Sequence, residues 1–164
     1  MPTPISHAAV GYALGAWLPH ETPPSATRVC IAAAACAALP DIDVLGFAPH
    51  RSITHSLAFA VVAGVLAAFL LFPRAGARTR RQLAVTLVLA LLSHSLLDGL
   101  TTYSMGIEYF APFSQVRYRF LWTPLGRPKG QLLNELVLEA LVVFLPAVLL
   151  AWWGVRQRRR AAPA

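Results

Sequence analysis

A histidine and an aspartate that stand four residues apart lie inside a long apolar segment of the chain. His94 and Asp98 therefore share one face of the helix that this segment predicts, one turn from each other. An aspartate at the centre of a membrane helix costs roughly 2.5–3.5 kcal/mol on insertion scales, so ionisable residues there are candidates for function. The H-x3-D spacing suits a metal site, and it equally suits a histidine that donates to a carboxylate and so joins two helices.

Other histidines and carboxylates fall at the ends of apolar segments. Antiparallel helices would bring these ends to one side of a bundle, together with the N-terminal helix if it packs upright. The residues expected to meet there are His7, Asp41, Asp43, His50, His55, His94, Asp98 and Glu135. The sequence therefore predicts a cluster of potential metal ligands at one face of the bundle.

Two short motifs supply half of this cluster. In PDID, Asp41 is favoured as a ligand, and Asp43 is either a second ligand or an acceptor that orients a histidine. Aspartates after proline also commonly form caps and turns, and that alternative stays open for PDID. In HRSITHS, His55 is preferred to His50 as a ligand.

The ligand types in this cluster, imidazole and carboxylate, suit Zn²⁺, Mn²⁺ or Fe²⁺. We expect one or two divalent ions, with zinc preferred and manganese or iron as alternatives. Two ions about 3.5–4 Å apart can bind a phosphate oxygen and lower the pKa of a bridging water, which is hydrolytic chemistry. Asp41 and Asp43 are candidate general bases, and Arg51 and Arg117 are candidates for neutralising developing charge.

Both arginines have a second interpretation. Arg51 could bind a substrate phosphate, or its side chain could extend to lipid phosphate at the membrane surface. Arg117 belongs to an aromatic-rich loop at 101–120, which suits either a lid that clamps an anion at the lipid interface or an ordinary interfacial belt.

Long apolar segments must position these residues. The hydrophobic fraction is 57% and the charged fraction is 13%, against roughly 45–50% and 25% in soluble proteins. Apolar runs predict transmembrane spans at 56–72, 83–100 and 132–153, preceded by shorter helices at 3–18 and 27–39. We therefore expect an all-α, polytopic membrane helical bundle, with residues 1–155 as one membrane-embedded domain and 156–164 as a basic tail.

The formal net charge of +7 is concentrated where apolar segments end. Arginine clusters at 74–81 and 156–160 each follow a long apolar run and lack the interleaved aromatics of a nucleic-acid site. We therefore expect membrane lipid as a partner and no nucleic acid. Arginine-rich short loops mark the cytoplasmic side, which predicts a cytoplasmic C-terminus and an extracytoplasmic metal site, although the 101–131 loop carries four further cations that oppose this orientation.

Five motifs, taken in order, resemble those of the membrane-bound, LexA-regulated metal-dependent hydrolase family, whose inner-membrane members are distantly similar to zinc-dependent phospholipase C. The resemblance covers roughly residues 4–150 and rests on His7 with Gly11, PDID at Pro40, HRSITHS at His50, HSLLD at His94 and PFS at Pro112. It implies a helical bundle with a phospholipase C-like metal site in a bacterial-type inner membrane. It also implies hydrolysis of a phosphoester, with a phospholipid as one candidate.

This resemblance maps six residues onto metal-ligand positions: His7, Asp41, His55, His94, Asp98 and Glu135. In the phospholipase-type site a histidine precedes the final glutamate by four residues, whereas the corresponding residue here is Gln131. This departure favours one or two ions over three.

A non-catalytic role is the competing interpretation, either as a structural metal site or as a metal-ion transporter or sensor. A transporter should line a path across the bilayer with polar or ionisable groups. The cytoplasmic ends of the predicted spans lack ligand-type residues, so the sequence favours a one-sided site.

Overall fold

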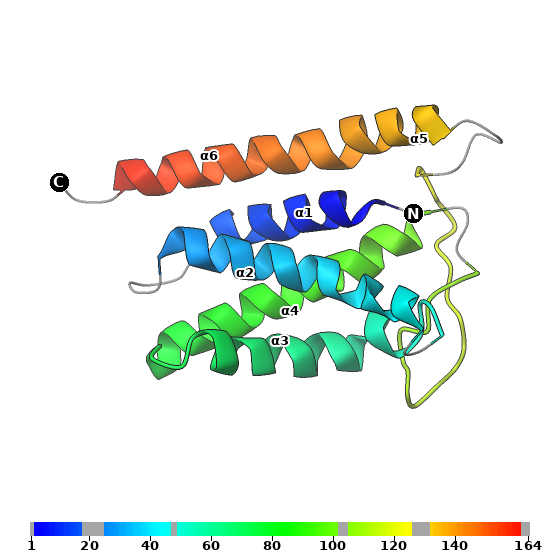
Figure 1. The fold of residues 1–164 in the computed structure, drawn as a ribbon, viewed down its shortest axis with the longest axis horizontal. Helices are drawn as coiled ribbons and strands as arrows, with labels where there is room; N and C mark the ends of the chain where they lie inside the picture. Colours follow the sequence, from blue (N-terminus) through cyan, green and yellow to red (C-terminus); the bar gives the residue numbers. More distant parts are fainter. Residues whose placement is uncertain (1, 18–24, 47–48, 102–104, 126–131, 162–164) are drawn as a thin grey trace.

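The computed structural model is a bundle of helices, described over residues 2–17, 25–46, 49–101, 105–125 and 132–161 (Figure 1). Its helices, in chain order, are α1 (Pro4–Trp17), α2 (Ala26–Ala38), η1 (Leu39–Leu45), η2 (Ile53–His55), α3 (Leu57–Leu71), α4 (Ala77–Gly99), α5 (Leu132–Glu139), η3 (Ala140–Phe144) and α6 (Leu145–Ala161). Here η1 and η2 are 3-10 helices, and η3 is a π-helical segment between α5 and α6. The predicted all-α class is confirmed for the described residues, where Ile107 and Tyr118 form an isolated β-bridge and no strand is present.

Within the described residues two helices, not three, are long and apolar enough to cross a membrane: Ala77–Gly99 and Leu132–Arg158. The predicted span at 56–72 is corrected, because α3 has only 15 residues. At 1.5 Å per residue such a helix covers about 22 Å, less than the roughly 30 Å of a bilayer core. Pro73 sets its end, since proline disfavours helical backbone at the preceding residue, and Phe72 is non-helical (φ −129°, ψ 56°).

Small residues allow the helices to pack closely. α1 lies between α2 and α6 (Figure 1), and α4 packs against α1, α2 and α3. Gly11 of α1 faces Ala33 of α2, and Gly64 of α3 faces Val88 of α4, so closely that an added Cβ would meet neighbouring backbone. Close approach through glycine and alanine is typical of helices that pack within membranes.

The outward faces of the long helices are apolar. Leu66 and Leu70 of α3 are 53% and 76% exposed, and Leu141 and Leu149 of the last helix are 59% and 55% exposed. In water such a continuous apolar surface would be an aggregation hazard, whereas lipid covers it without cost. The exposed faces therefore agree with a membrane environment.

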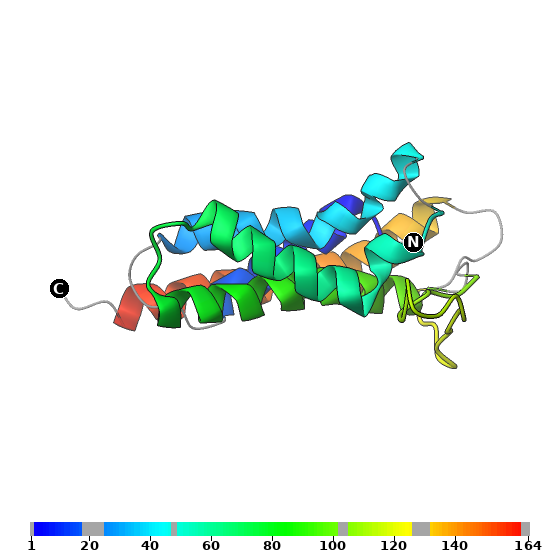
Figure 2. The same ribbon diagram turned by 90° about the horizontal axis from the view of Figure 1, so that it is seen from below.

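The bundle has two chemically different ends (Figures 1 and 2). At one end η1, η2, the 105–125 segment and the start of α5 lie beside the C-terminus of α4, and we call this the ligand end. The other end holds the turn between α3 and α4 and the end of α6, and we call it the arginine end. Its arginines donate hydrogen bonds to backbone carbonyl oxygens: Arg28, Arg80 and Arg158.

Candidate metal centre

Short 3-10 helices place the aspartates and one histidine at the ligand end. η1 carries Asp41 and Asp43 and ends at Gly46, whose φ of +90° lies in the left-handed region. Glycine adopts that conformation without steric cost, so the chain can turn sharply there. His55 closes η2 directly before Ser56, which caps the N-terminus of α3.

His55 and His94 face each other at the centre of the site, with their Nε2 atoms 3.1 Å apart. His94 Nδ1 lies 2.7 Å from the carbonyl oxygen of Ala37, which can only accept, so this nitrogen carries a proton. Thr54 donates its hydroxyl proton to Asp43, which leaves Oγ1 to accept from His55 Nδ1 at 3.0 Å. With both rings neutral, this assignment leaves both Nε2 atoms unprotonated, and two lone pairs this close call for a shared cation, either a proton or a metal ion.

The half-buried Asp41 and the buried Asp98 complete a group of four potential ligands whose binding atoms all lie within 4.8 Å of one another: Asp41, His55, His94 and Asp98. Asp41 Oδ1 is 3.4 Å from His94 Nε2, and Asp98 Oδ2 is 3.6 Å from His55 Nε2. Tetrahedral zinc with bonds of 2.0–2.1 Å would separate its ligand atoms by about 3.4 Å. Among the described residues neither carboxylate has a partner with hydrogen-bond geometry. Burying carboxylates without hydrogen bonds is costly, so this donor set fits a divalent ion, with the Arg51 guanidinium as an additional counter-charge to Asp98.

His7 extends this four-ligand group from the first turn of α1. Its ring stacks on His94 with centroids 3.8 Å apart and planes at 21°. Its Nε2 lies 3.5 Å from Asp98 Oδ1, the oxygen opposite to the one that faces His55. The ring is fully buried, and within the described part of the chain neither nitrogen has a hydrogen-bond partner. His7 therefore lies beside the four-ligand group and faces the second oxygen of Asp98.

Both carboxylate oxygens of Asp43 accept hydrogen bonds. Oδ1 accepts from His50 Nδ1 at 2.7 Å, and Oδ2 accepts from the Arg51 N–H at 3.2 Å and the Thr54 hydroxyl at 2.8 Å. Burial alone would raise the pKa of Asp43, but these hydrogen bonds and the neighbouring His55 hold it below its usual value. The geometry therefore favours Asp43 as the acceptor that orients His55, although Asp43, His50 and His55 also have metal-ligand spacing.

Arg51 is buried and has left-handed backbone, with φ of +64°. That conformation costs a non-glycine residue about 1–3 kcal/mol. Two hydrogen bonds hold it, because the Arg51 N–H donates to Asp43 and the Arg51 carbonyl accepts from the Glu108 N–H. The side-chain Nε lies 3.1 Å from Asp98 Oδ2. The guanidinium is thus directed into the site and away from lipid.

The 105–125 segment joins the ligand end through polar contacts. Glu108 forms an ion pair with Arg117 at 2.9 Å and accepts the Ser52 hydroxyl at 2.6 Å. Arg117 therefore neutralises a carboxylate of its own segment. The Tyr109 hydroxyl donates to the backbone oxygen of Ser95 at 3.2 Å, and burial raises the pKa of Tyr109 to about 12.

The structure gathers most of the predicted site residues at the ligand end: His7, Asp41, Asp43, His50, Arg51, His55, His94 and Asp98. Glu135 of α5 is half-buried and belongs to neither group with metal-ligand spacing. Glu139, one turn later, is buried and accepts hydrogen bonds from the Thr3 N–H and hydroxyl at 2.5 and 2.7 Å. Gln131, where the resemblance breaks down, lies outside the described residues.

Sequence reasoning missed three partners of the site: Thr54, Glu108 and Tyr109. The hydroxyl of Thr54 stands next to His55 in the chain, and that adjacency was a usable signal for an orienting role. Glu108 and Tyr109 gave no such signal, because the 105–125 segment has neither helical nor strand periodicity and its contacts are distant in sequence.

An apolar helical bundle with a buried histidine and aspartate cluster at one end defines a membrane protein with a candidate metal site. The chain belongs to the YdjM inner membrane protein family, whose model matches residues 1–161. It is 34% identical to the inner membrane protein YbcI of Escherichia coli (strain K12), over 95% of this chain and 100% of that protein. No solved structure matches it. Family membership and the two long apolar helices support the predicted inner-membrane location.

Proposed function

We propose that this protein is a membrane-bound, metal-dependent hydrolase that cleaves a phosphoester, with a phospholipid headgroup as the candidate substrate. The observation that carries the proposal is the facing pair of Nε2 atoms of His55 and His94, 3.1 Å apart beside two buried carboxylates. One divalent ion would satisfy all four groups at once. Zinc is the preferred ion for this set of nitrogen and oxygen ligands, with manganese and iron as alternatives.

The residues of the site divide into those that hold metal and those that act beside it. The four-ligand group would hold one ion, and His7 with the second oxygen of Asp98 could hold another. When bound, such an ion would supply a water of lowered pKa and a positive charge for a phosphate oxygen. Asp41, whose side chain at 10% exposure is the least buried of the four-ligand group, is the candidate general base. Arg51 is the candidate for stabilising anionic charge beside Asp98.

Metal content of the detergent-purified protein tests the first half of the proposal. Wild-type protein should hold near-stoichiometric zinc, manganese or iron by mass spectrometry, and His94→Ala and Asp98→Asn should each lose it. Thr79→Val is the control, because Thr79 is a buried residue at the start of α4 and belongs to neither group with metal-ligand spacing. Folded wild-type protein that takes up no metal on reconstitution would remove the basis of the proposal.

Turnover tests the second half. The metal-loaded protein should hydrolyse a fluorogenic phosphodiester or a phospholipid in mixed micelles. Arg51→Gln should keep its metal and lose about 10²–10³-fold in kcat, the cost of removing one group that stabilises transition-state charge. Metal-loaded wild type that turns over neither substrate would contradict the hydrolase assignment and leave the metal site standing.

A structural metal site is the second candidate function, and burial favours it. The side chains of His55, His94 and Asp98 are fully buried, and structural sites are closed whereas catalytic sites keep a position open to substrate. Removal of the metal with a chelator separates the two functions. A structural site predicts a large loss of thermal stability and no turnover by the loaded protein, whereas a hydrolase predicts turnover that returns when metal is restored.

A further inference from the structure

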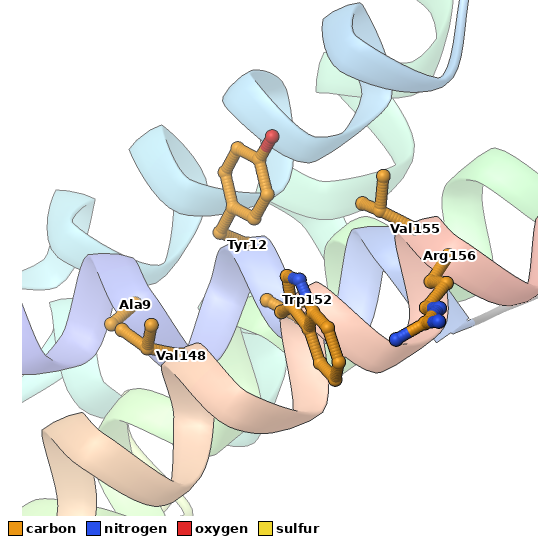
Figure 3. A pocket seen from close by; sticks show the side chains of 7 residues that line it. Ala9, Tyr12, Val148, Trp152, Val155 and Arg156 are labelled. Atoms are coloured by element: carbon orange, nitrogen blue, oxygen red, sulfur yellow. The ribbon is translucent and has the colours of Figure 1, made fainter.

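A groove lies between α1 and α6, toward the arginine end of the bundle (Figure 3). Its volume is about 600 Å³, and its lining residues are Ala9, Tyr12, Val148, Ala151, Trp152, Val155 and Arg156. Aliphatic and aromatic side chains form most of its length. The single charged residue of the lining, Arg156, stands at the end nearest the C-terminus of α6.

The dimensions of this groove match part of one lipid molecule. Val148, Trp152 and Arg156 are spaced four apart on α6, so they follow one face of the helix for about 12 Å at 1.5 Å per residue. One leaflet contributes about half of the roughly 30 Å hydrocarbon core. An acyl chain of one leaflet therefore fits beside the apolar residues while its headgroup reaches Arg156.

The charged end of the groove is suited to an anion. The guanidinium of Arg156 lies over the Trp152 ring, 5.1 Å from the ring centroid, which holds the cation above the groove. Of the described carboxylates, the nearest on the same helix is Glu139, which lies 17 residues earlier, about 26 Å along the axis. Arg160 lies one turn beyond Arg156 and outside the groove lining.

We propose that this groove binds an anionic phospholipid, with the phosphate on Arg156 and an acyl chain along Tyr12 and Trp152. The site lies at the opposite end of the bundle from the four-ligand group, so this lipid is a bound partner and not the proposed substrate. Within the described residues α6 packs onto the bundle mainly through α1. A lipid that fills the groove between these two helices would therefore help to hold α6 in place.

Quenching of tryptophan fluorescence by brominated lipids tests this proposal in the full-length protein. In the W17F/W122F/W153F variant Trp152 is the one tryptophan that remains. Brominated phosphatidylglycerol should quench its fluorescence with about five-fold higher apparent affinity than brominated phosphatidylcholine does. This factor corresponds to the contribution of one arginine near a charged lipid surface. The preference should vanish in Arg156→Gln. Arg160→Gln is the matched control, because it removes the same charge one turn away and lies outside the groove lining, so it should keep the preference.

Three outcomes would overturn the proposal. They are equal quenching by the two lipids, an unchanged preference in Arg156→Gln, and loss of the preference when inorganic phosphate is added, since the last result would show a site for a free anion. Ala9→Leu should weaken quenching by both lipids, because it narrows the apolar part of the groove. If the variant with Trp152 alone does not fold, native mass spectrometry of lipid adducts on wild type and Arg156→Gln measures the same preference.

Discussion

The tautomers of two histidines decide what the ligand end can bind. His94 gives its Nδ1 proton to the Ala37 carbonyl oxygen, and His55 gives its own to Thr54, whose hydroxyl proton goes to Asp43. None of these three hydrogen bonds uses the Nε2 atoms, so both Nε2 atoms remain free to bind one cation located between the rings. Residues that never touch an ion thus fix the direction in which its ligands point, as is common for histidine ligands.

Removing the hydroxyl of Thr54 should weaken metal binding while every ligand stays in place. Thr54→Val keeps the shape of the side chain, but the His55 Nδ1–H loses its acceptor at 3.0 Å. We expect the metal affinity, measured by competition with a chelator, to fall about 10–100-fold. Thr79→Val, which changes a buried threonine at the start of α4, should leave the affinity unchanged. Equal affinities in wild type and Thr54→Val would show that Thr54 does not orient His55.

At the scale of helices, a carboxylate on the last long helix fixes the position of the first. Glu139 accepts both hydrogen bonds of Thr3, and the Thr3 carbonyl accepts from the His7 N–H at 3.2 Å. The π-helical segment η3 begins directly after Glu139, and such segments are frequent at functional sites. Glu139 therefore sets where the first turn of α1, and with it the His7 ring, lies relative to Asp98.

Loss of the contact between Glu139 and Thr3 should loosen α1. It should also weaken metal binding, but by less than the loss of a direct ligand does. In Glu139→Leu, amide hydrogen exchange at residues 5–8 should become faster, and metal affinity should fall about ten-fold, as for other groups that orient ligands. Glu139→Gln keeps an acceptor for Thr3 and should recover most of the affinity. Glu135→Gln supplies the opposing test. If it releases metal while Glu139→Leu does not, Glu135 is the ligand that the family resemblance implies.

The positions of helices followed from the sequence better than their ends and lateral contacts. Apolar segments predicted the all-α class, and Pro73 marked the end of α3. The sequence nevertheless predicted a transmembrane span at 56–72, where the structure has a helix of only 15 residues. The sequence predicted Glu135 as a ligand, whereas Glu139, one turn later, is the residue that contacts Thr3. The position of a residue along one helix does not show which residue of a distant segment lies beside it. The contact between Glu139 and Thr3, which directly precedes α1, is therefore visible only in the three-dimensional structure.

At the scale of the whole molecule, the carboxylates are concentrated toward one end, where Arg51 and Arg117 pair with two of them. The described carboxylates and the candidate metal ligands lie toward the ligand end, and clustered arginines lie at the other (Figure 1). Arginine-rich segments favour the cytoplasmic side of the inner membrane. By this argument we expect the arginine end and the C-terminus to face the cytoplasm and the candidate metal site to face outward, where a lipid headgroup of the outer leaflet would reach it.

Cysteine labelling from outside the cell tests this orientation. Phe113 is 88% exposed in the segment at the ligand end, so the Phe113→Cys variant should react with a membrane-impermeant maleimide in intact spheroplasts. Gly76→Cys places a thiol in the turn at the arginine end, where no neighbouring atom would obstruct an added Cβ, and it should react only after permeabilisation. The native Cys30 and Cys36 are buried and should give little background. The reverse labelling pattern would place the candidate metal site in the cytoplasm, the side that the four cations of the 101–131 loop favour.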